Sequence, residues 1–336
     1  MSDIQTIELA HGGGGRLARR LLRDEILPRF GDGPLRNLPD AALLSSLKGK
    51  VVFTTDAFVV HPIEFPGGDI GRLAVHGSVN DVAVCGARPL WMSLALIIEE
   101  GLPIAVLRRA LDSVRAAADD CGIMLVTGDT KVVPRGQADG LYAVTACVGE
   151  LMEGFSLDPS LVRPGDAVIT SGTIGDHGIA VMAARHGLFQ NCAPRSDTAP
   201  VHRLTASLQP LAAGVRFMRD PTRGGVSGVL AEAVEDRPVD VILTETAIPV
   251  SPVVRAASEI LGIDILHAAC EGKVLAFCDE LIADAVVSAW RNLPEGRAAA
   301  HIGRVVEGRG RVIMETSAGG RRLVDLPRGE LLPRIC

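Results

Sequence analysis

Strand-like and helix-like segments alternate along this chain, and the alternation runs twice. In the first half we expect strands at 51–55, 94–98, 124–127 and 139–148, and helices at 68–85 and 104–121. In the second half we expect strands at 167–170, 239–243, 274–278 and 301–314, and helices at 178–186, 200–213, 222–234, 249–261 and 280–291. Such alternation predicts an α/β or α+β fold and excludes an all-helical or all-β one.

Glycines and prolines at 150–165 separate the two halves, and a chain of 336 residues is long enough for about two domains. We therefore predict one domain at 1–155 and a second at 156–320. Ahead of the first block we expect a short strand at 6–9 and a helix at 16–27. Residues 321–336 contain two prolines and several charges, and we predict a mobile tail that ends in Cys336.

Composition excludes several classes of function. With 34 basic and 40 acidic residues the net charge is -6, and aromatic residues make up only 3%, so we expect no nucleic-acid partner. No apolar run is long enough for a membrane span, and no secretory signal is visible at the N-terminus. Seven cysteines without a CxxC pair are typical of a reducing compartment, so we predict a cytoplasmic protein without a membrane partner.

The first glycine-rich feature is the run Gly12, Gly13, Gly14 and Gly15, which stands just before a predicted helix. Glycines let a backbone approach a phosphate closely, and a helix N-terminus favours an anion. A flexible loop explains the run equally well. No GK[ST] sequence occurs, so this is not a P-loop, and the dinucleotide-binding pattern lacks its acidic strand end. Two later turns, at 171–178 and 220–225, also precede helices, and Arg223 in the second could meet a phosphate or a carboxylate.

Three aspartates, Asp56, Asp81 and Asp129, end strands or stand in turns, and Asp40 is a weaker fourth. Carboxylates from separate elements can converge to bind Mg²⁺ together with phosphate oxygens. For each aspartate alone, the capping of a helix or turn is the more common role. Glu271, beside a glycine, is either a base or part of a surface turn.

Cys336 and two histidines complete the set of reactive side chains. A terminal cysteine on an extended arm can reach into a site as a thiolate, although the end of a chain can also carry such a residue by accident. His76 and His177 are of a type that more often packs or donates hydrogen bonds than binds a metal.

Taken together, the motifs resemble the HypE family of hydrogenase maturation factors, the carbamoyl dehydratases, within the aminoimidazole ribonucleotide synthetase superfamily. The resemblance spans the whole chain. It rests on the segments TDAFVV at 55–60, PGGDIG at 66–71, VND at 79–81, VTGDTKVV at 126–133, DPTRGG at 220–225, EGK at 271–273 and PRIC at 333–336.

This resemblance implies a homodimer in which the N-terminal sheets pair, with ATP and Mg²⁺ at the dimer groove. A HypF-type carbamoyl transferase would place a carbamoyl group on the terminal cysteine. The protein would then use ATP to dehydrate the group to a thiocyanate. The cyano group would pass to iron on a HypC–HypD complex, for the active site of a nickel–iron hydrogenase.

The resemblance also assigns roles to residues. Asp56, Asp81, Asp129 and, with less support, Asp40 would hold the metal. Lys131 and Glu271 would handle protons, although a lysine beside a triphosphate could instead hold a phosphate. The nucleotide would be bound by Gly12, Gly13, Gly14, Gly15, Asp56, Asn80, Asp81, Asp129, Thr130 and Arg223.

Four other functions stay open. A selenophosphate synthetase would need a cysteine or selenocysteine near the first glycine run, where this chain has His11. A thiamine-phosphate kinase or an aminoimidazole ribonucleotide synthetase would give no reason for a terminal cysteine. A scaffold without catalytic activity, whose tail docks on a partner, would need Cys336 but not the aspartates.

Overall fold

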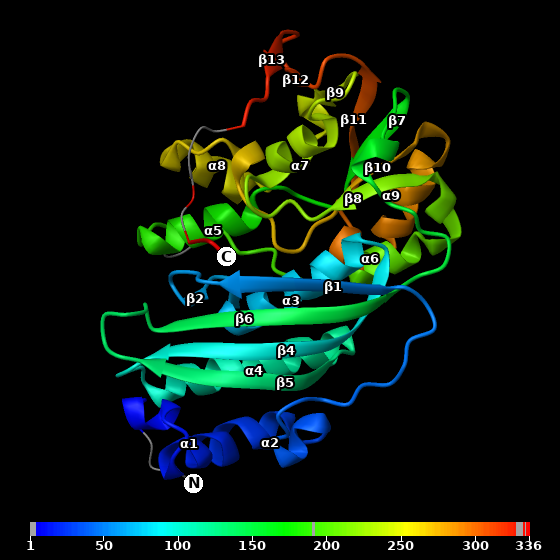
Figure 1. Ribbon diagram of the computed structural model, residues 1–336. Helices are drawn as coiled ribbons and strands as arrows, with labels where there is room; N and C mark the ends of the chain where they lie inside the picture. The colour runs from blue at the N-terminus through cyan, green and yellow to red at the C-terminus, as the bar shows by residue number, and fades with distance from the viewer. Residues whose placement is uncertain (1–4, 190–191, 327–331, 333) are drawn as a thin grey trace.

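The computed structural model describes residues 5–189, 192–326, 332 and 334–336. Its first half contains a four-stranded sheet in the order β1 (Val51–Phe58), β6 (Leu141–Leu151), β4 (Ala87–Glu99) and β5 (Met124–Val133). Strands β4 and β5 are parallel, and the other two pairs are antiparallel. Helices α3 (Ile70–Val84) and α4 (Ile104–Cys121) lie behind this sheet in Figure 1. The predicted strands and helices of the first block are confirmed, with longer strands than expected.

The two faces of this sheet differ. Leu94, Leu96 and Ile98 of β4 alternate onto the face that packs on the helices, and all three are buried. No helix lies in front of the other face in Figure 1. On β1 this second face leaves Val51 61% and Phe53 64% exposed. We call it the open face of the sheet.

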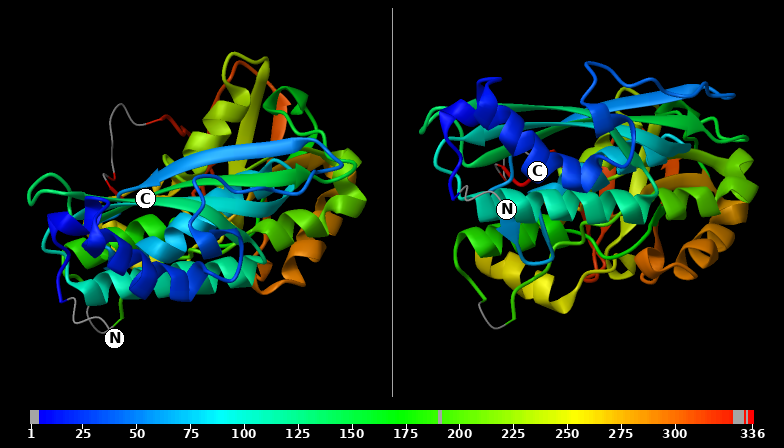
Figure 2. Two further views of the ribbon diagram at one scale, coloured as in Figure 1. Left: turned by 60° about the horizontal axis from the view of Figure 1, so that its bottom comes forward. Right: turned by 90° about the horizontal axis from the view of Figure 1, so that it is seen from below.

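The N-terminal helices extend along β5 and α4. A 3₁₀ turn at Leu9–Gly12 leads into α1 (Arg16–Leu21), a π-helical segment (Leu22–Ile26) and α2 (Leu27–Phe30), which lie alongside α4 in Figure 2. Buried Glu25 anchors them, because it accepts hydrogen bonds of 3.0 and 2.7 Å from the guanidinium of Arg108 on α4. The predicted strand at 6–9 is wrong. Only Thr6 makes a bridge, to Pro103, because this segment bonds to the turn at 101–104 and a 3₁₀ turn already begins at Leu9.

The second half is built around a seven-stranded sheet in the order β13-β12-β9-β11-β7-β10-β8. Its strands are β7 (Asp166–Thr170), β8 (Val215–Arg219), β9 (Val239–Thr244), β10 (Leu275–Asp279), β11 (Ala300–Glu307), β12 (Val312–Glu315) and β13 (Arg321–Leu323). Its helices are α5 (Asp176–Arg185), α6 (His202–Ser207), α7 (Gly225–Val234), α8 (Pro252–Leu261) and α9 (Ala283–Arg291). A hairpin of β2 (Glu64–Phe65) and β3 (Gly68–Asp69) precedes α3. Mixed α/β architecture is thus confirmed, and no helix of the described residues is long and apolar enough to cross a membrane.

Three details of the second half differ from the sequence expectations. The helix expected at 200–213 ends at Ser207, and a 3₁₀ segment leads into β8, which was not predicted. The strand expected at 301–314 is two strands, β11 and β12, joined by a turn with Gly310 at φ 82°. The predicted tail starts too early, because Arg321–Leu323 pair with β12 as β13 and Arg321 bonds to Glu315. Residues 327–331 and 333 of that tail lie outside the described residues.

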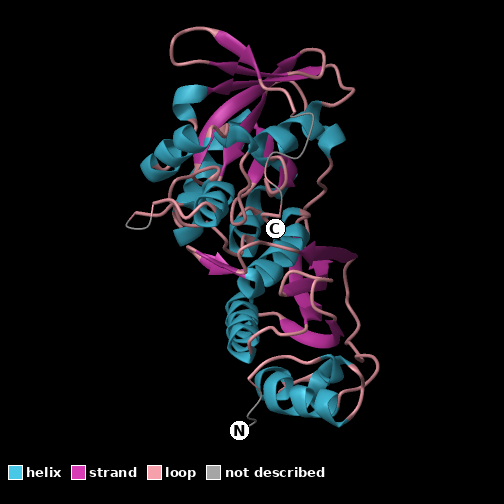
Figure 3. Cartoon of the chain, turned by 90° about the vertical axis from the view of Figure 1, so that its left-hand side faces the viewer, coloured by secondary structure: helices cyan, strands magenta, loops and turns pink. Residues whose placement is uncertain are grey.

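The two halves meet between α3 and the second half of the chain, as Figure 3 shows from the side. Fully buried Asn80 on α3 makes the central contact. Its amide nitrogen donates to the carbonyl oxygens of Ala199 and Glu271, and its oxygen accepts from the Val201 N–H. The division predicted at 155/156 falls in the segment 152–165 that links the two sheets.

Candidate functional site

Four acidic side chains gather where the two halves meet: Asp56 on β1, Asp81 on α3, Asp220 before α7 and Glu271 before β10. We call them the junction carboxylates. Hydroxyl groups fix the first two. Ser78 donates to Asp56 Oδ2 at 2.9 Å, and Thr54 donates to Asp81 Oδ2 at 2.6 Å. Regular elements of the first half therefore hold Asp56 and Asp81, whereas Asp220 and Glu271 come from loops of the second half.

The junction carboxylates disfavour one another's ionisation. Burial, followed by the charge of Asp81, raises the pKa of Asp56 above its usual range. Burial and the same aspartate raise the pKa of Asp220 to about 7. Burial and the charge of Asp220 raise the pKa of Glu271 well above its usual range. The exposed side chain of Arg223 opposes this effect at Asp56, but only in part.

This excess of negative charge fits a hydrated divalent cation. Mg²⁺ takes oxygen ligands and keeps several waters and phosphate oxygens, so one or two carboxylates suffice. Glu271 Oε1 is buried without a hydrogen-bond partner among the described residues. Among all the residues that the structure describes, no group of three His, Cys, Asp or Glu side chains is arranged to hold a metal by itself. The residues therefore fit an ion completed by water and phosphate, and the roles of Asp56 and Asp81 as its ligands stay a prediction.

Asn80 lies next to Asp81 but does not face this site. Both amide hydrogens and the carbonyl oxygen are used in the contact between the halves. The nucleotide-binding role predicted for Asn80 stays a prediction. In the structure, the Asn80 side chain positions Glu271 by donating a hydrogen bond to its main-chain carbonyl oxygen.

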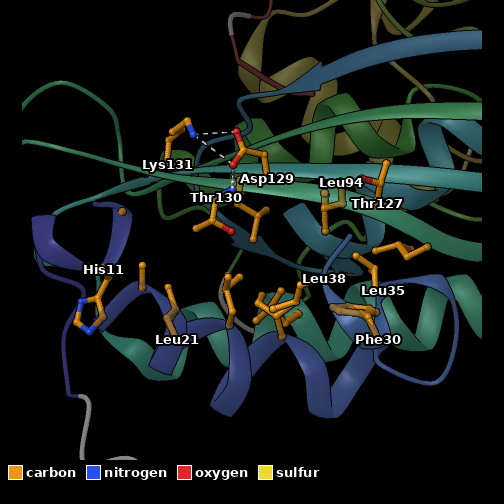
Figure 4. Close-up of a pocket in the computed structure, with 18 of the residues that line it drawn as sticks. His11, Leu21, Phe30, Leu35, Leu38, Leu94, Thr127, Asp129, Thr130 and Lys131 are labelled. Carbon is orange, nitrogen blue, oxygen red and sulfur yellow. Dashed lines mark hydrogen bonds and ion pairs between the residues drawn. The ribbon is translucent and has the colours of Figure 1, made fainter. Parts of the chain in front are cut away.

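A second site lies at the other edge of the sheet, where the N-terminal helices face β4 and β5 (Figure 4). It is a cavity of about 300 Å³ whose wall is largely apolar. We call it the β5 cavity. Its lining includes residues of three predicted groups: Gly12 and Gly14, then Asp129 and Thr130, then Lys131. An apolar cavity with a few polar groups at its rim is typical of small-molecule sites.

Asp129 and Lys131 form an ion pair at the rim of the β5 cavity. Lys131 Nζ lies 3.0 Å from Asp129 Oδ2, and the side chains are 65% and 59% exposed. The hydrogen bond from Lys131 lowers the pKa of Asp129. In Figure 4 both point away from the N-terminal helices, onto the open face, whereas Thr130 points toward the helices.

Two of the four glycines stand at positions where the backbone requires a glycine. A Cβ on Gly12 would lie 2.6 Å from the Val132 nitrogen, so only glycine lets the loop approach β5 this closely. Gly14 has a φ of 74°, in the left-handed region that favours glycine. A Cβ on Gly15 would meet open space, and one on Gly13 would lie 3.8 Å from the Ala10 oxygen, an ordinary contact. Asp40 is exposed on the loop after Pro39, which lines the cavity.

Within one chain these two sites do not meet. Asp56 pairs across the sheet with Thr145, Thr145 with Leu94, and Leu94 with Gly128, the neighbour of Asp129. Three strand spacings separate them, or about 14 Å. Side chains alternate along a strand, so Asp129 and Lys131 lie on the face opposite Asp56. The two predicted proton-handling residues, Lys131 and Glu271, are thus apart in the monomer.

Cys336 rests just past the end of β1. Its carbonyl oxygen accepts a hydrogen bond of 3.2 Å from the N–H of Val59, three residues after Asp56. The side chain is half-buried among apolar residues from both halves of the chain. The end of the chain appears in Figure 1 between α5 and the tip of β1.

Sequence reasoning missed the role of Asp220 as a junction carboxylate, and it missed Ser78 and Thr145. Asp220 follows β8, a strand that was not predicted, so its place at a strand end was hidden. Ser78 lies on the α3 face toward β6, where its hydroxyl and that of Thr145 are 2.6 Å apart. Its helical spacing from Asp81 was the available signal.

Both halves of the chain match known protein families. The family described as AIR synthase related protein, N-terminal domain, matches residues 39–151, and the corresponding C-terminal domain family matches residues 163–315. Carbamoyl dehydratase HypE of Cupriavidus necator is 46% identical over 98% of this chain and 95% of its own length. Carbamoyl dehydratase HypE of Escherichia coli is 39% identical over 99% and 100%.

Solved structures agree. A crystal structure of hydrogenase maturation protein HypE in complex with ATP superimposes with a TM-score of 0.94 at 41% identity, covering 98% of this chain and 100% of that one. A chain in a crystal structure of a HypE–HypF complex gives a TM-score of 0.81 at 41% identity, over 91% and 99%. On this sequence and structural similarity, the chain belongs to the HypE family of carbamoyl dehydratases, hydrogenase maturation proteins with the two AIR synthase related domains.

Proposed function

We propose that this protein dehydrates a carbamoyl group carried on the Cys336 thiol to a thiocyanate, in an ATP-dependent reaction that supplies cyanide ligands for the iron of a nickel–iron hydrogenase. The observation that carries the proposal is the position of the chain's own terminal cysteine, docked beside Val59 on the segment that follows Asp56. A thiol in this place presents its attached group to residues of both halves. Family membership supplies the reaction class.

ATP would contribute the phosphoryl group that turns the carbamoyl oxygen into a leaving group, and Mg²⁺ would neutralise charge on the phosphates. The overall change takes S–C(=O)–NH₂ and ATP to S–C≡N, ADP and phosphate. The carbamoyl oxygen leaves in the phosphate, and both N–H protons leave the nitrogen. The chain therefore has to position the thiol, bind the phosphates and accept two protons.

The nucleotide would occupy the β5 cavity and its rim. The apolar wall suits a base, and Gly12–Gly15, Thr130 and Lys131 supply backbone N–H groups, a hydroxyl and a cation for phosphates. The similar HypE structure in complex with ATP supports a nucleotide in this fold. Asp56 and Asp81 would hold Mg²⁺, and Asp129 would contribute only from the second chain of a homodimer, because within one chain it lies on the opposite face of the sheet.

Glu271 and Lys131 would handle the protons. A carboxyl group whose pKa is raised by burial is a better base once ionised, and approach of a cation to the junction carboxylates would favour its ionised form. Lys131 is paired with Asp129, so it would first bind a phosphate. Once the phosphate has left, it would carry a proton.

A homodimer would reduce the distance between the two sites. The open face of the first sheet carries Lys131, Asp129 and exposed apolar side chains such as Phe53. Such a face is typical of an interface. Two chains that pair their open faces would cover it and would place the β5 rim of one chain against the β1 edge of the other, with Asp56 on the far side of that edge strand.

The partners follow from the reaction. A HypF-type carbamoyl transferase would load the thiol, consistent with the HypE–HypF complex among the similar structures. A HypC–HypD iron scaffold would accept the cyano group. Both require that the tail leave its docked position.

Mass spectrometry of the C-terminal peptide tests the proposal. The protein is incubated with a HypF-type transferase and carbamoyl phosphate, purified, and then given ATP and Mg²⁺ or Mg²⁺ alone. We expect Cys336 to gain one carbamoyl group and then to lose the mass of one water only with ATP. If the peptide never changes while the protein hydrolyses ATP, the substrate is a different amide or phosphate acceptor. If neither happens, the scaffold function is favoured.

A further inference from the structure

The tail is held through the main chain of its last three residues. The Arg334 carbonyl oxygen accepts from the N–H of His61 at 3.1 Å and from the guanidinium of Arg185 at 2.9 Å. The Ile335 carbonyl oxygen accepts from His177 Nε2 at 2.6 Å, and the Cys336 carbonyl oxygen from Val59 N–H at 3.2 Å. Donors from both halves of the molecule thus meet three consecutive carbonyls.

His177 is the central donor. It lies in the first turn of α5 and is fully buried, with the Phe65 ring edge-on at 5.4 Å. A carbonyl oxygen only accepts, so Nε2 carries the proton and Nδ1 of the neutral ring accepts from the Ser196 hydroxyl, 2.8 Å away. That hydroxyl oxygen in turn accepts from the Thr198 N–H at 3.1 Å. Ser196 therefore fixes the tautomer that binds the tail.

Apolar and ionic contacts complete the docking. Leu332 and Ile335 are 7% and 4% exposed, so the tail fills part of the core where the two halves meet. Arg334 donates to Asp139 Oδ2 at 2.7 Å and to the Val59 carbonyl at 3.1 Å. If the tail left, the His177 N–H would lose its partner in a buried position, which is costly unless water enters.

We propose that His177, oriented by Ser196, is a clamp that docks the C-terminal tail and positions Cys336 for the reaction. The clamp binds the main-chain carbonyl of Ile335, one residue before the cysteine. This inference rests on the proposed function for its consequence in catalysis, but the docking itself does not.

Accessibility of Cys336 tests the docking without any activity. The ligand-free protein is treated with iodoacetamide, and alkylation of the C-terminal peptide is followed by mass spectrometry. His177→Leu removes the donor and should speed alkylation about tenfold, the factor for one buried hydrogen bond. His177→Gln keeps an N–H near the Nε2 position and should restore most of the protection.

The chain offers a control in His11, a buried histidine of the N-terminal segment. Its ring accepts from the Glu8 N–H, away from the tail and from the Ser196 and Thr198 contacts, so His11→Leu should leave alkylation of Cys336 unchanged. Asp139→Asn is a second tail variant, on a partly exposed residue, and it should raise the rate about twofold. Equal rates in wild type, His177→Leu and Asp139→Asn would overturn the clamp, as would an equal rise in His11→Leu.

Single-turnover kinetics then separate the clamp from the reaction. With carbamoylated protein and saturating ATP, His177→Leu should form thiocyanate about tenfold more slowly, while loading by the transferase is not slowed. Faster alkylation together with an unchanged dehydration rate would overturn the positioning role. If alkylation responds as expected but even the wild type forms no thiocyanate, the docking stands and the proposed function fails.

Discussion

The two edges of the first sheet carry aspartates in opposite electrostatic states. At the β1 edge, the junction carboxylates lie close together, and burial and mutual repulsion raise the pKa of Asp56, Asp220 and Glu271. At the β5 edge, Asp129 is exposed and paired with Lys131, and its pKa is lowered. The carboxylates at the β1 edge thus carry more negative charge than nearby cations neutralise, whereas Lys131 neutralises Asp129 at the β5 edge.

This contrast indicates which edge is adapted to a cation. Buried like charges cost folding free energy, and such a cost persists where function requires it. A cation at the β1 edge would relieve the repulsion, whereas the β5 edge already has its counter-charge. The comparison therefore predicts that loss of a carboxylate at the β1 edge lowers activity but raises stability. Loss of a charged side chain at the β5 edge should lower activity and leave stability nearly unchanged.

Asp81→Asn should produce the largest effect. It removes one proposed Mg²⁺ ligand, so we expect thiocyanate formation to fall about a thousandfold. It also removes the charge that raises the pKa of Asp56 and Asp220, so the ligand-free protein should melt at a higher temperature. Single-turnover mass spectrometry and thermal melting measure the two. Asp284→Asn, an exposed change on α9, serves as control. Near-normal turnover in Asp81→Asn would contradict the metal role and favour the scaffold function.

Lys131→Ala tests the other edge. We expect thiocyanate formation to fall about a hundredfold, in the range for one acid–base or charged group. The ion pair is exposed, so the free energy of unfolding should change by less than about 1 kcal/mol. Lys131→Arg keeps the charge but is a poor proton acceptor. Full activity in the arginine variant would assign Lys131 to phosphate binding, and loss in both variants would assign it to proton transfer.

The pH dependence of stability should also distinguish the edges. Asp220 has a pKa of about 7 in the folded protein, above its ordinary value of 3.8. The folded state therefore holds this proton where the unfolded state has lost it, so this contribution to stability is present at low pH and is lost as pH rises through about 7. The melting temperature of the ligand-free protein should fall between about pH 4 and pH 7 and level off above that range. Asp220→Asn should flatten that decline, and an unchanged decline would show that other groups cause it.

Local sequence signals predicted the elements of the fold better than the contacts among them. The strand at 51–55 and the helix at 104–121 have strong periodicity, and the structure contains both. Strand β8 was missed because its apolar residues follow a helix-like stretch without a clear break. The real boundary is the 3₁₀ segment of Gln209–Gly214, which short-range patterns identify poorly.

The site illustrates the same limit. The motifs around Asp56, Asp129 and Glu271 mark chemistry-bearing residues in the sequence, but they do not show that Asp129 and Asp56 lie on opposite faces three strands apart. That separation depends on sheet order, which is a property of long-range pairing. His177 is a similar case. Its hydrogen bond to Ile335 joins residues 158 positions apart, and a single sequence carries no signal for such a contact.

The smallest predicted effect concerns the glycine run beside Asp129. Ala at position 12 would place its Cβ 2.6 Å from the Val132 main-chain nitrogen, so the loop must move away from β5, at a cost of about 1–3 kcal/mol. Ala at position 15 meets open space, and its backbone, at φ -84° and ψ -162°, suits alanine, so stability should rise by about 0.4–1 kcal/mol. Urea unfolding measures both. Equal effects would mean that the loop does not rest against β5 in solution, so that the rim of the β5 cavity forms only when a ligand holds it.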